Sequence, residues 1–152
     1  MIQRVQSIWL FLASLTLFLL LILPIFTKQG TSGDLSFQIG GIYQKTNNVS
    51  HKTESFTALF GGTILVGLIC LANIFTFKNR SLQKNIILLT ILLIIALAGW
   101  TASYAFNIPG GFDGAVFGVG AGLPIFSILF CVLAIRGIRK DEQLIRSADR
   151  LR

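Results

Sequence analysis

The chain has 152 residues, of which 53% are apolar and only 12% are charged, and its mean hydropathy is +0.75. About a quarter of the residues of an average soluble domain are charged, whereas here the apolar residues form continuous blocks of the length that a bilayer requires. Composition therefore excludes an ordinary soluble domain and predicts an integral membrane protein, in which the formal net charge of +7 needs an explanation.

The first apolar block covers residues 7–26, SIWLFLASLTLFLLLILPIF, and contains no charged side chain. A cleaved signal peptide is the alternative, since the block follows Arg4 at the N-terminus. Its apolar run is longer than the roughly 7–15 residues usual for a signal peptide, and no small-x-small cleavage site follows it in LPIFTKQ. We therefore expect residues 7–26 to remain as a membrane-spanning helix.

An external loop is expected at residues 27–56. Leu35, Phe37 and Ile39 alternate there with polar residues before a Gly-Gly pair, which is typical of a short β-hairpin. An irregular loop with polar flanks fits the same residues, and the sequence leaves both interpretations open.

The second and third spans are predicted at residues 57–77, TALFGGTILVGLICLANIFTF, and 86–106, IILLTILLIIALAGWTASYAF. Small residues recur at a spacing of four in both, and in the second span Ala58 pairs in this way with Gly62 and Thr63 with Gly67. Such faces let membrane helices approach closely. Asn73 is the one amide within these spans, and we expect it to hydrogen-bond to a neighbouring helix.

The fourth span is predicted at residues 115–135, AVFGVGAGLPIFSILFCVLAI. Pro124 lies near its middle, where proline removes a helical hydrogen bond and tends to kink a helix. We interpret the whole block as one helix because residues 123–135 alone are too short to span and nothing nearby has a strand pattern. Gly114, Gly118 and Gly122 recur every four residues, which predicts a helix face for close packing.

The cytoplasmic tail, residues 136–152, is predicted to continue as an amphipathic helix. Leu144, Ala148 and Leu151 fall on one face at helical spacing. The basic residues that we expect to contact a partner protein or anionic lipid are Arg139, Lys140, Arg146 and Arg150. A solvated tail that only anchors the topology is the competing interpretation.

Orientation follows from the basic residues, because Lys and Arg concentrate in cytoplasmic loops. Four spans place the N-terminus, the loop at residues 78–85 and the tail on one side. That side carries ten of the thirteen basic residues against three acidic ones, which accounts for the whole net charge. The ten are Arg4, Lys78, Arg80, Lys84, Arg136, Arg139, Lys140, Arg146, Arg150 and Arg152. Both termini are therefore predicted to be cytoplasmic.

The sequence contains no recognisable arrangement of catalytic residues. The four predicted spans contain no Asp, Glu, Lys, Arg or His, which disfavours an ion-coupled transporter. Cys70 and Cys131 do not form a CxxC pair and are expected to be structural, and His51 has no metal ligands at suitable spacing. We expect no enzyme activity, no cofactor, no metal and no nucleic acid partner.

The stretches MIQRVQSIWLFLAS, FKNRSLQ and IRKDEQLIRSADRLR resemble the bacterial family catalogued as domain of unknown function 4293. The resemblance covers nearly the whole chain. It implies a multi-pass protein of the bacterial inner membrane, with four spans, typical of Bacteroidota. It implies no activity.

These observations together predict an all-α integral membrane protein with one membrane domain, residues 1–152, built as a four-transmembrane-helix bundle. Two functions stay open. The first is a non-catalytic accessory or assembly subunit, whose partners would be the lipid bilayer and another membrane or cytoplasmic protein. The second is a carrier or pore for a small neutral or lipid-like solute.

Overall fold

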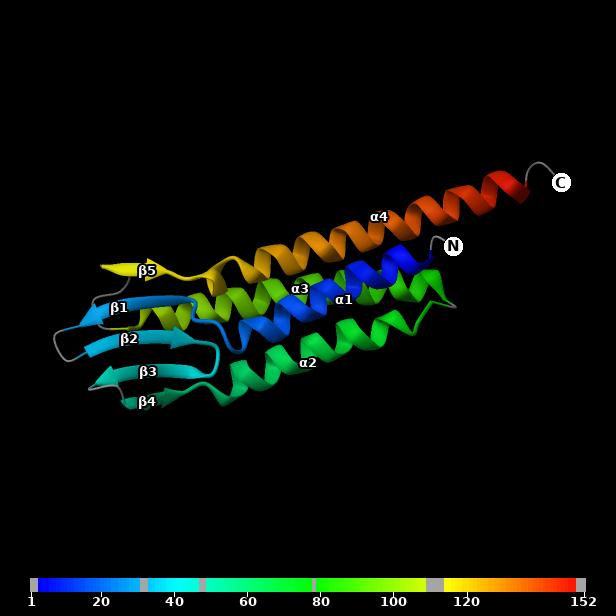
Figure 1. Ribbon diagram of the computed structural model, residues 1–152. Coiled ribbons are helices and arrows are strands. Elements are labelled where there is room, and N and C mark those ends of the chain that lie inside the picture. Colours follow the sequence, from blue (N-terminus) through cyan, green and yellow to red (C-terminus); the bar gives the residue numbers. More distant parts are fainter. Residues whose placement is uncertain (1–2, 31–32, 47–48, 78, 109–113, 150–152) are drawn as a thin grey trace.

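The computed structural model describes residues 3–30, 33–46, 49–77, 79–108 and 114–149. Within them the chain forms four long helices that lie side by side, with a β-sheet at one end of the bundle (Figure 1). The helices are α1 (Gln3–Leu20), α2 (Thr57–Ile74), α3 (Arg80–Phe106) and α4 (Leu123–Asp149). The strands are β1 (Phe26–Gly30), β2 (Gly33–Gln38), β3 (Gly41–Thr46), β4 (Val49–Ser55) and β5 (Ala115–Phe117), and a short 3-10 helix, η1, covers Val119–Ala121.

The prediction of an all-α fold is wrong, because the described residues include a five-stranded antiparallel sheet with the order β4-β3-β2-β1-β5. The segment expected to be a loop or a single hairpin supplies four of these strands. Its flanks suggested coil because they are polar, but a sheet packed on one face leaves alternate side chains to solvent. Polar residues such as those of β4 therefore suit an outer strand.

The alternation seen around Phe37 sets which face of the sheet is buried. Phe37 is fully buried and pairs with Phe26 on one side and Ile42 on the other. The intervening Ser36 and Gln38 are only partly buried. The apolar face rests on the ends of the helices, where it forms one core with Leu20, Leu59, Ala105 and Leu123 among others.

The prediction of one helix over residues 115–135 is also wrong in its first half. Ala115–Phe117 is strand β5, which pairs with β1, and α4 begins only at Leu123. Pro124 is the second residue of α4, a position whose missing N–H has no intrahelical partner to lose. The proline therefore lies in the first turn of this helix and does not kink it. The helix continues beyond the predicted end at residue 135, to Asp149.

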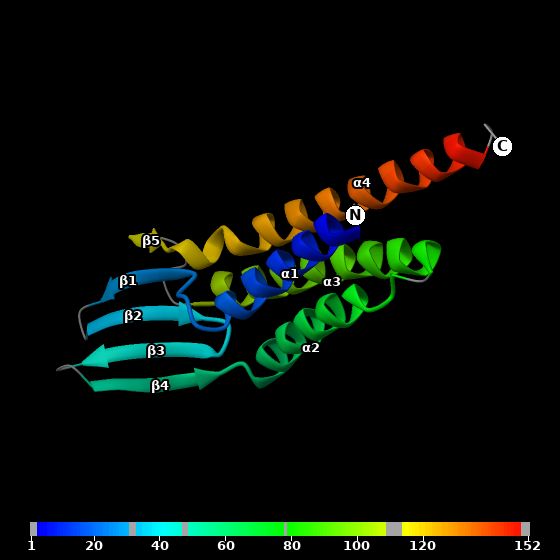
Figure 2. The ribbon, with the colours of Figure 1, turned by 45° about the vertical axis from the view of Figure 1, so that its right-hand side comes forward.

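The four helices pack so that each contacts two neighbours: α1 and α3 both lie against α2 and α4. The buried core of the bundle is aliphatic and includes Leu10, Leu17, Ile87, Ile94 and Ile138. Consecutive helices run in opposite directions: α1 and α3 run toward the sheet, whereas α2 and α4 run away from it (Figure 2).

Among the described residues, three helical segments are long and apolar enough to cross a membrane, namely Thr57–Ile74, Arg80–Phe106 and Val119–Leu144. A shorter apolar helix covers Gln6–Leu20; α1 ends at Leu20 and not at residue 26 as expected. Large apolar side chains such as Leu92 and Ile125 are more than half exposed on the outer surface of the bundle. These features are compatible with a membrane protein.

Candidate functional site

The small residues of α2 face other helices of the same chain. A Cβ atom added at Gly62 would lie 3.2 Å from Leu97 Cδ2 on α3, and one added at Gly67 would lie 3.2 Å from the ring of Phe18 on α1. Both contacts are tight, so a larger side chain would push α2 away from its neighbours. Close packing at these two glycines therefore involves the protein's own helices.

The glycines before α4 do not share a helix face, contrary to the sequence prediction. Gly114 lies in a turn with φ +72°, Gly118 has an extended backbone, and Gly122 ends η1. The N–H groups of Gly118 and Gly120 donate to the carbonyl oxygens of Ile25 and Pro24, at 2.8 and 3.1 Å. Small residues are needed at Gly118 and Gly120 because an added Cβ would lie 2.6 Å from the Pro24 oxygen.

Asn73 lies at the end of the bundle opposite the sheet and is 1% exposed. Its side-chain amide donates to the Gln83 carbonyl at 3.2 Å, and the Gln83 amide donates to the Asn73 carbonyl at 3.4 Å. This reciprocal pair ties the end of α2 to the start of α3. The Asn73 Oδ1 atom has no hydrogen-bond partner among the described residues.

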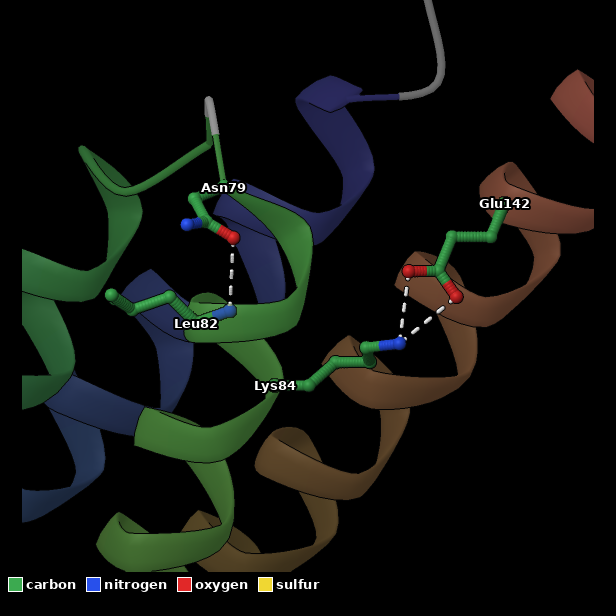
Figure 3. Close-up of polar contacts among 4 residues, drawn as sticks. All are labelled: Asn79, Leu82, Lys84 and Glu142. Carbon is green, nitrogen blue, oxygen red and sulfur yellow. Dashed lines mark hydrogen bonds and ion pairs between the residues drawn. The ribbon is translucent and has the colours of Figure 1, made fainter.

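The part of α4 that follows the predicted fourth span is held against α1 and α3. Lys84 Nζ on α3 lies 2.9 Å from both carboxylate oxygens of Glu142 (Figure 3). Gln6 on α1 donates to the carboxylate of Asp141, which is buried. A Cβ atom at Gly137 would lie 3.1 Å from the Gln6 side chain, so this glycine lets α1 approach. The sequence analysis placed Gly137, Asp141 and Glu142 in a cytoplasmic tail beyond the fourth span and predicted no contact between them and α1 or α3.

The start of α3 lies in the same region as this ion pair. Asn79 caps the helix, because its side-chain oxygen accepts a hydrogen bond from the Leu82 N–H at 3.2 Å (Figure 3). The cap fixes the first turn of α3, and Lys84 lies one turn further along the same helix. The position of the lysine opposite Glu142 therefore follows from where α3 begins.

The end of α4, coloured red in Figures 1 and 2, extends past the other three helices, whereas Arg139 and Lys140 come before Asp141 and Glu142, which contact α1 and α3. Arg139 and Lys140 are exposed. Arg146 belongs to α4, but its side chain is outside what the structure describes, and Arg150 lies outside the described residues. The structure therefore places two of the four predicted contact residues on an exposed helical surface.

A cavity of about 190 Å³ lies between the sheet and the helices. It borders α1, α2 and α3, the strands β1, β2 and β5, and the segment from η1 to Pro124. Its described lining is apolar except for two threonines, and it consists of Leu17, Leu20, Ile25, Phe26, Phe37, Ile39, Thr63, Ile94, Leu97, Ala98, Thr101, Ala102, Ala105, Phe117, Gly120, Ala121 and Pro124. The sequence analysis missed this cavity because its lining comes from segments far apart in the chain.

Aromatic rings form the sheet side of the cavity. Phe26 and Phe37 stack with their centroids 4.9 Å apart, and Phe26 meets Phe117 edge-on at 6.5 Å. Phe37 also contacts Phe56, which stacks on Tyr104 of α3 at 4.4 Å. Such ring pairs add to the free energy of burial, so the series fastens the sheet to α3 and holds that side of the cavity.

The two cysteines are free thiols buried in the bundle core. Cys70 donates a weak hydrogen bond to the Leu10 carbonyl, with Sγ and O separated by 3.4 Å, and its thiol also contacts that of Cys131. This juxtaposition of residues from α2 and α4 has no signal in the sequence. His51 is exposed on β4, and no group of three potential metal ligands occurs among the described residues.

Comparison with known proteins was made for the whole chain. The family model described as Domain of unknown function (DUF4293) matches residues 2–151. The chain belongs to this family. The match confirms the resemblance, which rested on the two ends of the chain and on FKNRSLQ and was expected to cover nearly the whole chain. Neither the curated proteins nor the solved structures gave a match.

Proposed function

We propose that this DUF4293 protein is a non-catalytic, multi-pass protein of the bacterial inner membrane that acts as an accessory or assembly subunit. In this proposal both termini are cytoplasmic and the sheet lies on the outer side. The positive-inside rule supports that orientation, because the start of α1, the link from α2 to α3 and the end of α4 lie at the same end of the bundle, opposite the sheet (Figure 1).

The observation that carries the proposal is the course of α4. The helix does not end at the level of the other three but continues as one rod of 27 residues to Asp149. Lys84 and Gln6 hold it at Glu142 and Asp141, so the turns that follow leave the bundle in a fixed direction. A helix that carries exposed Arg139 and Lys140 just before this anchor, and Arg146 on the turns after it, suits contact with an acidic protein surface or with anionic lipid.

The test removes four positive charges from the tail. Changing Arg139, Lys140, Arg146 and Arg150 to Gln should leave insertion intact, since Arg4, Lys78, Arg80, Lys84 and Arg136 still direct orientation. We expect stoichiometric partners, recovered after cross-linking in native membranes, to fall at least about tenfold. The matched control changes Lys28, Lys45 and Lys52 of the sheet to Gln and should keep the partners.

Unchanged partner recovery in the tail variant would reject this function. Binding of the isolated peptide 135–152 to vesicles separates a protein partner from lipid. Strong, salt-sensitive binding to anionic vesicles, with no protein partner lost from cells, assigns the tail to the membrane surface instead.

A carrier or pore for a small neutral or lipid-like solute is the second candidate, and the apolar cavity under the sheet favours it. The small residues Gly120 and Ala121 border that cavity next to Pro124. A carrier that acts through its membrane core should keep its activity when the tail arginines and lysine are replaced. The tail variant therefore also separates the two candidates.

A further inference from the structure

The cavity beneath the sheet is a space that the described side chains leave unfilled. Its volume of about 190 Å³ exceeds the roughly 150 Å³ of apolar cavities that stay dry and accept benzene. Thr63 and Thr101 are the only polar side chains in its described lining, and their hydroxyls donate to the carbonyls of Leu59 and Leu97 at 2.8 and 2.7 Å. The cavity therefore suits an apolar group better than water, which needs several polar partners.

The cavity borders about three turns of α3. Its lining on this helix runs from Ile94 to Ala105, a distance of about 16 Å at the rise of an α-helix. Ala98 and Ala102 lie between them and have short side chains. An apolar lining that extends this far along one helix suits a hydrocarbon chain better than a compact ring system.

One wall of the cavity is open to the surroundings. Most lining residues are buried, but Ala98 and Ala102 on α3 and Ala121 and Pro124 opposite them are partly exposed, and Phe117 is 63% exposed. The opening therefore lies between α3 and the start of α4. The outer surface beside it is apolar, with exposed Ile95 on α3 and exposed Ile125 and Phe126 on α4.

The segment before α4, which borders the opening, is held by backbone contacts. Gly120 donates to the Pro24 carbonyl at 3.1 Å, and any Cβ atom at this position would collide with that oxygen. The segment cannot fold inward to fill the space without breaking this contact. Because apolar side chains around an empty space lose van der Waals contacts, hydrocarbon from outside is a favourable occupant.

We propose that this cavity binds one acyl chain of a bilayer phospholipid, which enters between α3 and α4. The inference rests on the membrane location proposed above, because a bilayer supplies acyl chains at very high concentration directly outside the opening. It does not depend on the tail or on any partner protein. The sheet closes the cavity on its outer side, so the chain is bound and held, with its terminal methyl pointing away from the sheet, toward Leu17 and Ile94.

The experiment uses the full chain in liposomes that contain a phospholipid with a photoactivatable diazirine in the middle of one acyl chain. After illumination, mass spectrometry of peptides identifies the labelled residues. Labelling is expected on lining residues of α3 such as Leu97 and Thr101. In Ala102→Phe, whose ring occupies the cavity, labelling of these residues should fall at least about fivefold. In Ala96→Phe, which places the same ring on the exposed side of α3, it should stay within about twofold of the wild type.

Ala98→Leu is a milder filling variant, in case Ala102→Phe does not fold, and should also lose label. Resistance of each variant to alkaline extraction from membranes is measured in parallel, so that failure of membrane insertion is distinguished from failure of lipid binding. Equal labelling in filling and control variants of inserted protein would overturn the proposal. Stronger labelling by a free fatty acid bearing the same diazirine, at equal mole fraction, would overturn the assignment to phospholipid.

Discussion

At the residue scale, Gly41 is the position where the sheet depends most directly on a missing side chain. Its φ of +145° is one that L side chains rarely adopt, and an added Cβ would lie 2.0 Å from the Glu54 carbonyl oxygen. Gly41 is the first residue of β3, after the two-residue connection from β2. It pairs with Ser55 of β4, and the register between β3 and β4 shifts just after it, between Ile42 and Tyr43. Both the backbone conformation and the spacing of two strands therefore require glycine here.

Gly41→Ala should lower the free energy of unfolding by roughly 1–3 kcal/mol, the usual magnitude for a strained backbone position. Gly99→Ala is the matched control, because Gly99 lies within α3 with nothing within 4 Å of an added Cβ. That change should be neutral or stabilising by up to about 1 kcal/mol. Unfolding by denaturant in a mild detergent measures both, and a similar cost at the two glycines would contradict the turn geometry.

The ion pair between Lys84 and Glu142 gives a second residue-scale expectation. Both side chains are 27% exposed, so solvent screens the pair and its coupling should be only about 0.5–1 kcal/mol. A double-mutant cycle with Lys84→Met and Glu142→Gln measures that coupling. It should shrink in high salt, whereas a cycle between Lys84 and exposed Arg139 should give no coupling. A coupling near zero for the first pair would mean that α4 is held by its apolar contacts and by Gln6 alone.

Single residues were predictable only where their own chemistry carried the signal. Asn73 is an amide within an apolar helix, so a hydrogen bond to a neighbouring helix could be expected, and the structure supplies one. Its partner Gln83 lies outside the predicted spans and gave no signal. The burial of Asp141 depends on the approach of Gln6 beside Gly137, a contact between the two ends of the chain, and no local pattern encodes it.

At the scale of elements, the helices were predictable and most of the sheet was not. A continuous apolar run of about 20 residues identifies a spanning helix almost regardless of its surroundings. The strands depend on pairing, and only the alternation around Phe37 was visible. One signal was overlooked: β2, β3 and β4 begin at Gly33, Gly41 and Val49, eight residues apart. Short strands at such a regular spacing are typical of an antiparallel sheet.

Strand β5 was hidden by a different cause. Its three residues are apolar and precede an apolar helix, so composition merges them with the span. Gly114, Gly118 and Gly122 suggested a helix face because their spacing of four matches a helical turn. In the structure Gly118 and Gly120 let the segment after β5 approach Pro24, whereas Gly114 and Gly122 make no contact with it.

Substitutions at two of these glycines separate the observed geometry from a helix face. Gly118→Ala should destabilise the protein by about 1–3 kcal/mol, because the Cβ would lie 2.6 Å from the Pro24 backbone oxygen. Gly122→Ala should cost less than about 1 kcal/mol, since its Cβ would meet only ordinary contacts at 3.6 Å and beyond. Unfolding in detergent compares the two with exposed Val116→Leu as a mild control. Equal costs at Gly118 and Gly122 would favour a shared face over the strand and 3-10 arrangement.

At the scale of the whole molecule, the chain divides its charge between two ends. The sheet end carries lysines and acidic residues in similar number, whereas the opposite end carries the basic residues that remain, among them Arg80, Lys84, Arg139 and Lys140. The apolar surface of α2, α3 and α4 lies between these ends. The apolar segment of α1, Gln6–Leu20, is shorter, but it packs between α2 and α4. One bilayer crossing by the whole bundle satisfies all these features together.

That crossing can be tested with two engineered cysteines, Ser55→Cys at the end of β4 and Ser81→Cys at the start of α3. Both serines are exposed, while the native Cys70 and Cys131 are buried, so the unmodified protein is a control that should not react. A membrane-impermeant maleimide added to intact cells should label Ser55→Cys and should reach Ser81→Cys only after the membrane is permeabilised, because the proposed orientation puts the basic end in the cytoplasm. The reverse pattern would invert the proposed orientation. Labelling of both in intact cells would contradict a bundle that separates two compartments, and the acyl-chain site would then lose the bilayer that supplies its ligand.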